Sequence, residues 1–507
     1  MTSTDATGSG RRSSGGIRLG IMCNGTAFPA WQAEAIRGLL AIDEVNLVAL
    51  IVNGRRSSGS RLSRIRDRKH LLWLLFNKGH AERASRASRA TDLSDELGEV
   101  PRLRCTTVPS GRFGEAFVGA DLDAIREFEL DVVLRFGFGI LKGDILSLPK
   151  YGIWSFHHGD ERAFRGRPPF FWEMLAGEQV VGAILQRLTD RLDGGVVLHR
   201  GFFKVTPQSY LRTRDEAFLG SAEWPSIVVR QILNGESNPV DADPSPTNAS
   251  VRRDPGNGTT LLFLWRQAVA FLGAQWRGLT QAAQWSVGVA SAPIGDFLGD
   301  RLPDLTWYPS APRGRYLADP FAVRHNGDLV VLVEEFDYMR NRGVISAMSV
   351  GVADPPTRVV IDPGVHASYP YLFKAEGEIW CIPETYQARE VRLYRAVEFP
   401  DKWEHVATPI SGVAALDSTV ILHQGRWWMF LTDQEAGPNT KLRIWHATHL
   451  TGQWEPHLLN PVKTDVRSSR PAGTPFLVDG VLYRPAQDCS RSYGGSSNLT
   501  GHAVPAW

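Results

Sequence analysis

Apolar and polar positions in the first half of the chain follow a β-α-β order. Continuous apolar runs at residues 17–23 and 45–52 predict buried strands, and the amphipathic run 31–41 between them predicts a helix. A helix over 122–128 and a strand over 131–138 continue the alternation. Strands that alternate with helices are typical of an open, mostly parallel sheet, so we predict an α/β fold for this half.

From Trp307 onward the pattern becomes all-β and repeats itself. Short apolar hairpins recur with turn glycines roughly 50 residues apart, which is the spacing of blades in a β-propeller; the glycines are Gly327, Gly377, Gly425 and Gly480. Each unit runs on to an acidic residue: Glu334, Glu384, Asp433 and Asp488. We therefore expect an all-β propeller domain over residues 301–507 with four recognisable blades.

The ends of the predicted α/β domain are marked by composition. Residues 1–16 are rich in Ser, Gly and Thr and have no apolar core, so we expect a disordered leader and no signal peptide. The α/β domain then spans residues 17–234. Residues 235–257 are rich in Pro, Asn, Asp and Ser, which predicts a linker.

Residues 258–300 are apolar but interrupted, and we expect connecting helices there. Arg266 and Arg277 break the run below the roughly 18 apolar residues that a membrane-spanning helix needs. We favour a helix that docks two domains over an interfacial membrane helix, and peripheral membrane contact stays open.

Charge and cysteine content exclude several classes of protein. A net charge of +2 with 22% charged residues does not favour DNA binding. The local basic segment 55–89 is interpreted as a solvated helix face in preference to an anion-binding surface. Four widely spaced cysteines fit neither a metal knuckle nor a disulfide framework, so we expect a cytoplasmic protein.

Residues 151–198 carry the candidate chemistry of the first half. A strand over 151–156 leads into His157, a helix is expected over 170–175, and a strand over 181–188 leads to a turn at Asp193. Groups beyond the carboxyl ends of neighbouring strands meet at one edge of an open sheet. A metal site at His157 and His158 with Asp160 and Glu161 is not favoured, since adjacent loop histidines rarely reach one ion.

This stretch resembles the folate-dependent formyltransferases, the family of methionyl-tRNA, glycinamide-ribonucleotide and amino-sugar N-formyltransferases. The resemblance rests on Ser155-Phe156-His157, Arg165-Gly166 and Leu192-Asp193-Gly194-Gly195. It implies that His157 and Asp193 are catalytic, with Ser155 at the position where the family has Asn. It also implies 10-formyltetrahydrofolate as the cofactor, held by Asp190 and by the turn Phe136, Gly137, Phe138, Gly139, Ile140 and Leu141.

The acceptor side of that site is assigned more loosely. His158, Arg165 and Glu173 are candidates for substrate binding, and for Glu173 a solvated helix carboxylate is an equal alternative. Formyl transfer needs a deprotonated amine and a stabilised oxyanion. A histidine beside a carboxylate meets the first need, because the carboxylate fixes the ring tautomer.

The repeats resemble the five-bladed propeller of furanosidase-type glycoside hydrolases and, more closely, the N-terminal module named after plant glucosamine inositolphosphorylceramide transferase. The residues that carry this resemblance are ADPF at 318–321, SYP at 368–370, IPET at 382–385, LDST at 416–419 and SRPAG at 469–473. Asp319, Glu384 and Asp417 are candidate site residues, and Arg470 stands where a general acid is expected. Carboxylates that bond backbone between blades are the favoured alternative.

The sequence thus predicts an enzyme that transfers a formyl group to an amino sugar or glycoconjugate. Three alternatives stay open: a non-catalytic carbohydrate-binding scaffold of formyltransferase fold, a glycan-acting enzyme with its site in the propeller, and methionyl-tRNA formyltransferase-like activity. A tRNA partner is less favoured, because a propeller replaces the barrel that the methionyl-tRNA enzymes use for tRNA.

Overall fold

A computed structural model describes residues 16–55, 68–111, 114–191, 194–281, 284–299, 303–308, 311–349, 357–491 and 496–502. The chain divides into two compact units. The first, called the α/β unit, runs to Ala268, and the second, called the β unit, begins at Val269 and also includes Phe202–Val205. Each unit is described by itself.

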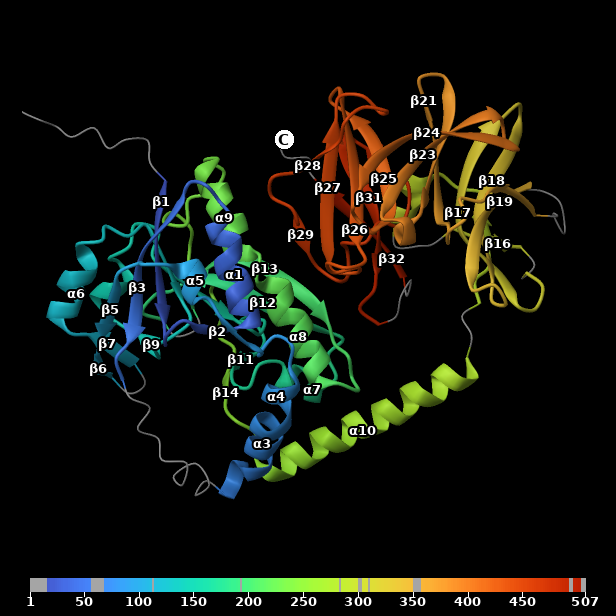
Figure 1. Cartoon of the computed structure of the whole chain (residues 1–507). Helices are drawn as coiled ribbons and strands as arrows, with labels where there is room; N and C mark the ends of the chain where they lie inside the picture. The colour runs from blue at the N-terminus through green and yellow to red at the C-terminus, as the bar shows by residue number, and fades with distance from the viewer. Residues whose placement is uncertain are drawn as a thin grey trace, which may run out of the picture. The chain divides into compact units, whose positions relative to one another are not determined.

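A seven-stranded sheet forms the centre of the α/β unit (Figure 1). Its order is β13-β12-β10-β8-β1-β3-β5, in which β1 lies parallel to β3 and β8, and β10 lies parallel to β8 and antiparallel to β12. The bounds are β1 Ile17–Cys23, β3 Val45–Asn53, β5 Arg102–Cys105, β8 Val132–Arg135, β10 Ile153–His157, β12 Val180–Arg187 and β13 Val196–Lys204. The predicted strands are confirmed to within a few residues at their ends.

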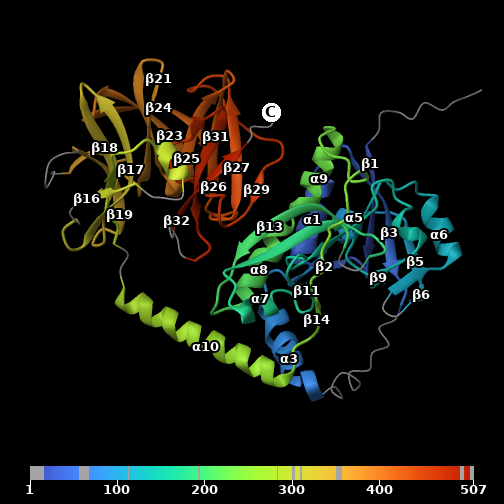
Figure 2. The same cartoon turned by 180° about the vertical axis from the view of Figure 1, so that it is seen from behind.

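Helices cover both faces of this sheet (Figures 1 and 2). On one face, Trp31 of α1 meets Phe156 of β10 edge to face. On the other, Ile125 of α6 packs with Met22 and Val133 of the strands. The helices are α1 Ala30–Leu40, α5 Ser94–Leu97, α6 Gly119–Arg126, α7 Phe171–Ala176, α8 Tyr210–Ser221 and α9 Trp224–Leu233. Ser209 caps α8 by accepting a hydrogen bond from the Arg212 amide, which fixes where that helix begins.

Two small sheets and a helical segment complete the α/β unit. One sheet pairs β2 Ala27–Pro29 with β4 Ala90–Asp92, and the other joins β6 Thr107–Ser110, β7 Gly114–Phe117 and β9 Ile140–Leu141. A 3₁₀ turn, η3, covers Asp144–Leu146. The described part of the predicted basic segment is helical: η1 Arg68–His70, α3 Leu71–Phe76, η2 Asn77–Ala81 and α4 Glu82–Ala84. Trp73 is buried against Phe171, whereas Leu75 is exposed.

Residues 235–257, expected as a linker, are bound to the α/β unit. The buried Glu161 accepts a hydrogen bond from Ser245 at 3.0 Å. Strand β14 Val251–Arg252 pairs with β11 Arg165–Gly166. Gly166 has φ +96°, and a Cβ there would lie 2.1 Å from the Arg252 carbonyl oxygen, so the contact requires glycine. Residues 235–257 therefore have the polar composition of a linker but pack against the α/β unit.

Residues 258–300, expected as connecting helices, hold one α-helix among the described residues. Helix α10 spans Asn257–Thr280, and it is followed by β15 Gly288–Ala290 and the 3₁₀ turn η4 Ile294–Leu298. Strand β15 pairs with β16 Leu305–Trp307. Phe263 of α10 packs on Phe171 with ring centroids 4.3 Å apart.

Four successive antiparallel sheets build the rest of the β unit. The first joins β17 Arg315–His325, β18 Asp328–Asp337, β19 Arg342–Ser349 and β20 Arg358–Ile361; the second joins β21 Ser368–Ala375, β22 Glu378–Glu384, β23 Glu390–Glu398 and β24 Lys402–Ser411, with the 3₁₀ turn η5 Tyr386–Ala388 between its strands. The third joins β25 Ala415–His423, β26 Arg426–Asp433, β27 Lys441–Ala447, β28 Glu455–Pro456 and β29 Lys463–Thr464; the fourth joins β30 Phe476–Val478, β31 Val481–Asp488 and β32 Ser496–His502.

Each predicted repeat corresponds to one of these sheets. The first hairpin of each sheet turns on a pair with positive φ at both positions, such as Asn326 at +51° with Gly327 at +94°. Such a pair forms the two-residue hairpin turn that matches strand twist, which is why the glycines recur. One hydrophobic cluster spans the first three sheets, from Phe321 through Trp380 to Met429. Closure of these sheets into a propeller stays a prediction.

Candidate functional site

Four polar side chains share one face of the central sheet where β8 and β10 end. Arg135 is the last residue of β8, and Ser155 and His157 alternate along β10. Gln186 of β12 stands directly opposite Ser155 in the antiparallel pair. Cross-strand partners and alternate residues project to the same side of a sheet. We call Arg135, Ser155, His157 and Gln186 the polar face.

Arg135 connects this face to the turn 136–139. Its Nη2 donates to the Ser155 Oγ at 2.9 Å, and its Nη1 donates to the Gly139 carbonyl at 2.6 Å. The Gly139 amide in turn donates to the carboxylate of Glu115. Phe138 has φ +65°, a backbone conformation that side chains rarely adopt. The turn is therefore held in a fixed shape from two sides.

The glycines of this turn are explained by close packing. A Cβ on Gly137 would lie 2.9 Å from the Cys23 carbonyl carbon, and one on Gly139 would lie 3.1 Å from Glu115. Phe136 places its ring edge against Trp31, and Leu141 is buried while Ile140 is partly exposed. Contact between this turn and a pteridine stays a prediction.

His157 and Glu173 converge on Gly159. A Cβ built on Gly159 would lie 3.1 Å from His157 Nε2 and 3.5 Å from Glu173 Oε1, so only glycine leaves both side chains in place. Glu173 is buried, and burial together with the charge of Asp160 raises its pKa to about 7. Near neutral pH, Glu173 exchanges a proton readily beside the histidine.

Gln186 was not singled out from the sequence. Its side chain is 5% exposed, and within the described residues its Oε1 has no hydrogen-bond partner. A Cβ on Gly195 would lie 2.7 Å from that oxygen, so Gln186 borders the turn that follows residue 193. A buried amide oxygen without a partner is rare, and a ligand could satisfy it. A lone Gln in the apolar run VVGAILQR was the signal available.

The last polar-face residue, Arg135, was also missed, although an arginine ending the buried strand VVLR was visible in the sequence. Asp193, expected to be catalytic, lies outside the described residues. Asp190 accepts a hydrogen bond at its carbonyl from Lys142.

His158 and Arg165 are placed differently from the expectation that they bind the acceptor. His158 neighbours His157 on the strand and therefore faces the opposite side, where its ring stacks on Phe218 at 3.7 Å. Burial lowers the pKa of His158 to about 3, so the ring is neutral. Arg165 donates to the Ala249 carbonyl at 3.1 Å and so binds segment 235–257. These contacts tie both residues to the fold, and acceptor binding by either stays a prediction.

Asp160 and Glu161, weighed as metal ligands, are paired with arginines. Arg200 contacts Glu161 at 2.6 Å and Asp160 at 3.2 Å. Among the residues that the structure describes, no group of three or more His, Cys, Asp or Glu side chains could hold a metal ion. In the same part of the chain, no helix is long and apolar enough to cross a bilayer.

A cavity of about 450 Å³ in the β unit gathers the candidate carboxylates of the repeats. We call it the acidic pocket. Asp319 and Glu334 come from the first sheet and Glu384 from the second, and aromatic rings of Tyr316, Phe336 and Tyr369 share its lining. Asp319, Tyr369 and Asp417 occupy equivalent bulged positions, with φ +50°, +42° and +51°. The repeat thus brings this position of the first two units, Asp319 and Tyr369, to the cavity lining.

Two of these carboxylates are bound within the protein. Asp417 accepts from Arg470 Nε at 2.6 Å and from Gln487 Nε2 at 2.8 Å. Glu384 accepts from the Asp417 amide at 3.0 Å and from Ser368 at 3.1 Å. Burial raises the pKa of Glu384 far above its ordinary value, with Asp417 adding to the shift. These contacts match the alternative in which carboxylates join neighbouring repeats.

Asp319 and Glu334 are the two carboxyl groups of the first sheet that line the cavity. Burial, with the charge of Asp417, raises the pKa of Asp319 to about 7. Burial, with the charge of Asp319, raises the pKa of Glu334 to about 8. His366 accepts from the Gly343 amide at Nδ1 and places Nε2 4.0 Å from Glu334. A protonated Glu334 beside a titrating Asp319 is an acid-base pair at neutral pH.

Two residues of the predicted repeat need correction. Strand register sets Ala318 opposite Glu334 and Ser368 opposite Glu384, but Leu416 opposite Thr432. In the fourth unit Gln487 reaches the pocket. The sequence repeat assigned these places to Asp433 and Asp488, one residue further on, and a shift by one residue moves a side chain to the other face.

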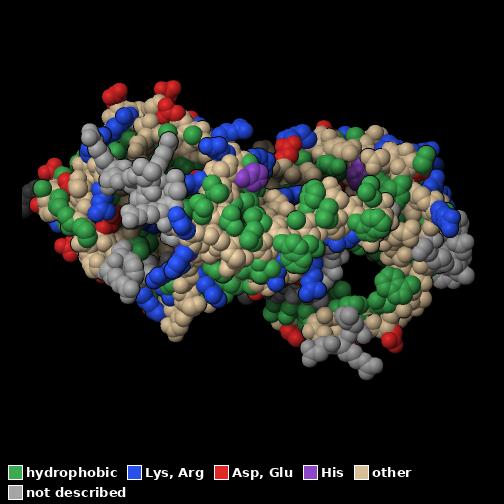
Figure 3. Space-filling view, turned by 90° about the horizontal axis from the view of Figure 1, so that it is seen from below, with side chains coloured by type: hydrophobic (Ala, Val, Ile, Leu, Met, Phe, Trp, Pro, Cys, Tyr) green, Lys and Arg blue, Asp and Glu red, His purple; other side chains and the backbone are tan. Residues whose placement is uncertain are grey.

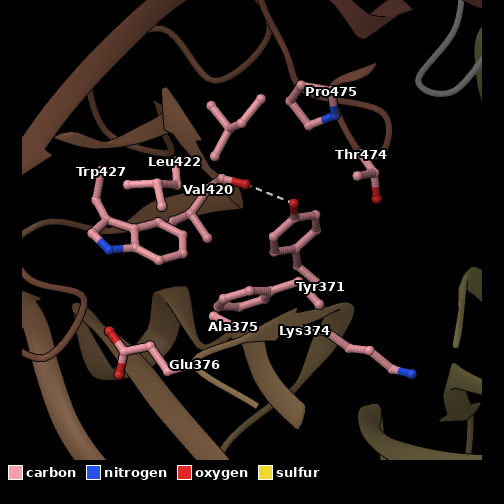
Figure 4. Close-up of a pocket in the computed structure, with 11 residues that line it drawn as sticks. Tyr371, Lys374, Ala375, Glu376, Val420, Leu422, Trp427, Thr474 and Pro475 are labelled. Carbon is pink, nitrogen blue, oxygen red and sulfur yellow. Dashed lines mark hydrogen bonds between the residues drawn. The ribbon is translucent and has the colours of Figure 1, made fainter. Parts of the chain in front are cut away.

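A second cavity, of about 280 Å³, lies at the C-terminal ends of β21 and β25 (Figure 4). Tyr371 lines it and donates from its hydroxyl to the Val420 carbonyl at 2.7 Å, and Trp427 and Leu422 line it as well. Lys374 donates to the Arg324 carbonyl at 2.7 Å. The lining is mostly apolar, and we assign this cavity no chemistry.

Comparison with known proteins gives similarity of two kinds. A family model described as "Glucosamine inositolphosphorylceramide transferase 1, N-terminal" matches residues 307–500, within the β unit. The protein of that name from Arabidopsis thaliana is 32% identical over 227 residues, which are 43% of this chain and 28% of the relative. The rice protein is 34% identical over 38% of this chain and 26% of the relative. The chain thus spans little more than a quarter of these relatives.

The other similarity is to formyltransferases. A methionyl-tRNA formyltransferase from Cutibacterium acnes is 30% identical over 31% of this chain and 45% of its own length. Among solved structures, glycinamide ribonucleotide transformylase 1 from Symbiobacterium toebii matches with a TM-score of 0.30 and 16% identity, covering 44% of this chain and 90% of that chain. An exo-β-1,3-galactanase from Phanerochaete chrysosporium matches with a TM-score of 0.31 and 10% identity, covering 37% and 46%. The sequence relatives are transferases by name, and each matches only part of the chain.

Proposed function

We propose that the α/β unit transfers a formyl group from 10-formyltetrahydrofolate to the amine of an amino sugar or glycoconjugate. The carrying observation is the convergence of His157 and Glu173 on Gly159, on the face that also holds Ser155 and Gln186. In an open α/β sheet, chemistry occurs beyond the carboxyl ends of parallel strands, and β8 and β10 both end there.

The polar face fits the needs of this reaction. Bound 10-formyltetrahydrofolate would supply the formyl group to the acceptor amine, and its N10 would leave with the proton that the amine gives up. His157 takes that proton as general base and returns it as general acid, and Glu173 positions the imidazole. A neutral Ser or Gln donor stabilises the oxygen as it gains charge.

Gln186 supplies an amide where the family resemblance expects one. Ser155 is bound to Arg135, but the amide of Gln186 stands opposite with a buried oxygen that has no partner among the described residues. Its NH₂ group and oxygen exchange places by a rotation of the side chain. The pterin would lie along the turn 136–141 and Asp190, and Asp193 would hold His157.

Titration calorimetry with 10-formyltetrahydrofolate and a hydrolysis-resistant analogue tests the cofactor. A formyl-transfer assay with a panel of free amino sugars, amino-sugar glycoconjugates and methionyl-tRNA tests the acceptor. We expect binding by the wild type, and a 100- to 10,000-fold loss of transfer in His157→Ala, of the order that general acid-base catalysis contributes. His80→Ala, which removes an exposed histidine of the same unit, is the control.

The outcomes separate the alternatives. Binding without transfer to any acceptor supports a non-catalytic scaffold, and transfer to methionyl-tRNA alone supports the tRNA-modifying reading. No binding at high micromolar ligand overturns the formyltransferase proposal.

A second candidate function rests on the acidic pocket. We propose it as a saccharide site, and the four sheets as blades of a propeller, because Asp319 and Glu334 combine a carboxylate and a protonated carboxyl in a cavity with aromatic walls. Arg470 binds Asp417 and so cannot act as a general acid. Glycan turnover that is lost in Asp319→Ala and retained in His157→Ala would establish this function. Turnover that ignores Asp319 would exclude it.

A further inference from the structure

Helix α10 carries an exposed apolar stripe on one face. Leu261, Trp265, Val269, Leu272, Trp276 and Leu279 follow one another at intervals of three or four residues, which places them on the same side of a helix. Their exposed fractions lie between 50% and 85%. We call these six residues the α10 stripe, and Figure 3 looks onto this part of the molecule, where apolar side chains gather with Lys and Arg beside them.

The first half of α10 is anchored to the α/β unit through the face opposite Leu261 and Trp265, and the second half contains no buried residue. Thr260 and Phe263 are buried, and Phe263 packs on Phe171. The Gln267 side chain accepts a hydrogen bond from the Tyr210 amide at 2.8 Å. A helix fixed along one side presents its other side as a stable surface.

Charge decides which partner fits the stripe. Helix α10 contains no Asp or Glu, and its two charged residues are Arg266 and Arg277. The exposed η1 residues Arg68 and Lys69 lie at its beginning, where Asn257 Nδ2 donates to the Arg68 carbonyl at 2.6 Å. An apolar stripe with tryptophans, on a helix whose charged residues are all arginines, is typical of a helix that lies in the interface of an anionic bilayer.

Leu75 extends this apolar surface beside the same end of the helix. It is 61% exposed on α3, whose Leu72 amide donates to Asn257 Oδ1 at 3.0 Å. The helix itself, with 24 residues, is roughly 36 Å long. We propose that α10 and α3 dock this protein peripherally on a membrane surface that carries anionic lipids, with the α10 stripe in the headgroup region. This inference does not depend on the proposed reaction.

Flotation of the full chain with lipid vesicles tests the docking. We expect binding to vesicles of phosphatidylcholine with phosphatidylserine, at least tenfold weaker binding to phosphatidylcholine alone, and weakening by salt, because the cations contribute through screened attraction. Leu272→Glu with Trp276→Glu removes two large apolar groups from the stripe, and we expect at least a tenfold loss of binding.

A matched control is the exposed apolar residue Val397 of β23, since Val397→Glu adds a charge away from α10. Arg277→Gln tests the charge, and we expect it to reduce binding to anionic vesicles and leave binding to neutral vesicles unchanged. Circular dichroism and thermal scans establish that each variant is folded.

Three results overturn the proposal: no wild-type binding to anionic vesicles, equal binding by wild type and the stripe variant, or equal loss in Val397→Glu. Light scattering adds a fourth, because a wild-type dimer that the stripe variant converts to monomer, without vesicle binding, shows the stripe to be a self-association surface.

Discussion

The polar face of the α/β unit and the acidic pocket of the β unit both collect buried polar side chains, yet they differ in how these groups are satisfied. At the acidic pocket, Glu384 and Gln487 of the lining are bound by Asp417: the Asp417 amide donates to Glu384, and the Asp417 carboxylate accepts from Gln487 and Arg470. On the polar face, the oxygen of Gln186 is buried without a partner among the described residues.

This difference separates groups that hold the fold from groups that can act on a ligand. A fully satisfied network rigidifies its surroundings, whereas a buried group without a partner is kept at a cost that a ligand can offset. By this criterion Asp417, Glu384 and Arg470 are structural. Gln186, whose amide oxygen has no partner among the described residues, is the group to test for function by the same criterion, whereas Asp319 and Glu334 are to be tested because of their raised pKa values.

Breaking the satisfied network gives the largest expected effect. Arg470→Met leaves Asp417 and Glu384 buried without their cation, and we expect the free energy of unfolding to fall by about 3–5 kcal/mol. Denaturant titration followed by tryptophan fluorescence measures the loss. Arg395→Met is the control, because its ion pair with Glu404 is exposed and contributes about 1 kcal/mol at most. Equal losses in the two variants would contradict a structural role for Arg470.

Removing the amide of Gln186 should lower the activity and leave the stability of the fold intact, the reverse of the effect expected for Arg470. Gln186→Leu replaces the amide by an apolar side chain of similar size. It breaks no hydrogen bond of the Gln186 Oε1 atom, because that atom has no partner among the described residues. We expect kcat/KM for formyl transfer to fall about 100- to 1000-fold while the melting temperature stays unchanged or rises. A loss of stability with unchanged transfer would assign Gln186 to the fold and would remove the contrast with Arg470.

Strands and helices with strong periodicity were predicted correctly from the sequence. Residues 17–23 form β1 as expected, and the helix expected over 31–41 is α1 Ala30–Leu40. The recurring hairpin glycines were also visible, since a turn with positive φ at two positions restricts the residue that fits. Local rules decide these features, so the local sequence was sufficient.

Features that depend on partners far along the chain were missed or misplaced. Segment 235–257 has the composition of a linker, but Ser245 satisfies the buried Glu161, which no local pattern reveals. Likewise, the hydrogen bond from Arg135 to Ser155 requires β8 and β10 to be neighbours. Asp433 follows its turn glycine Gly425 by eight residues, whereas Glu334 follows Gly327 by seven, so Thr432 and not Asp433 takes the equivalent place in the strand register.

Protonation of Glu334 makes the stability of the protein depend on pH, which tests whether this carboxyl of the acidic pocket is neutral near pH 7. Its pKa rises from an ordinary 4.5 to about 8 through burial and the charge of Asp319. The folded state therefore holds this proton more tightly than the unfolded state, and the resulting stability is complete below pH 4.5 and lost as pH rises toward 8. We expect Glu334→Gln to remove this loss, roughly 3–4 kcal/mol between pH 5 and 8.5.

Melting curves of the wild type and Glu334→Gln at those two pH values measure the effect. Glu335→Gln is a neighbouring control, because its carboxylate is bound by Ser346 and Arg315. Parallel pH profiles for wild type and Glu334→Gln would show that Glu334 is ionised at neutral pH and would weaken the case for the pocket as an acid-base site.

The smallest expected effect concerns the turn beside the polar face. Gly137→Ala places a Cβ 2.9 Å from the Cys23 backbone, and we expect a loss of about 1–3 kcal/mol in unfolding free energy as the turn shifts. Gly119→Ala, where a Cβ meets nothing within 4 Å, is the control. If the turn lines a folate site, affinity for the formyl-folate analogue should fall in Gly137→Ala and not in Gly119→Ala. Lost stability with unchanged affinity would confine the turn to packing and leave His157, Glu173 and Gln186 as the only parts of the site supported here.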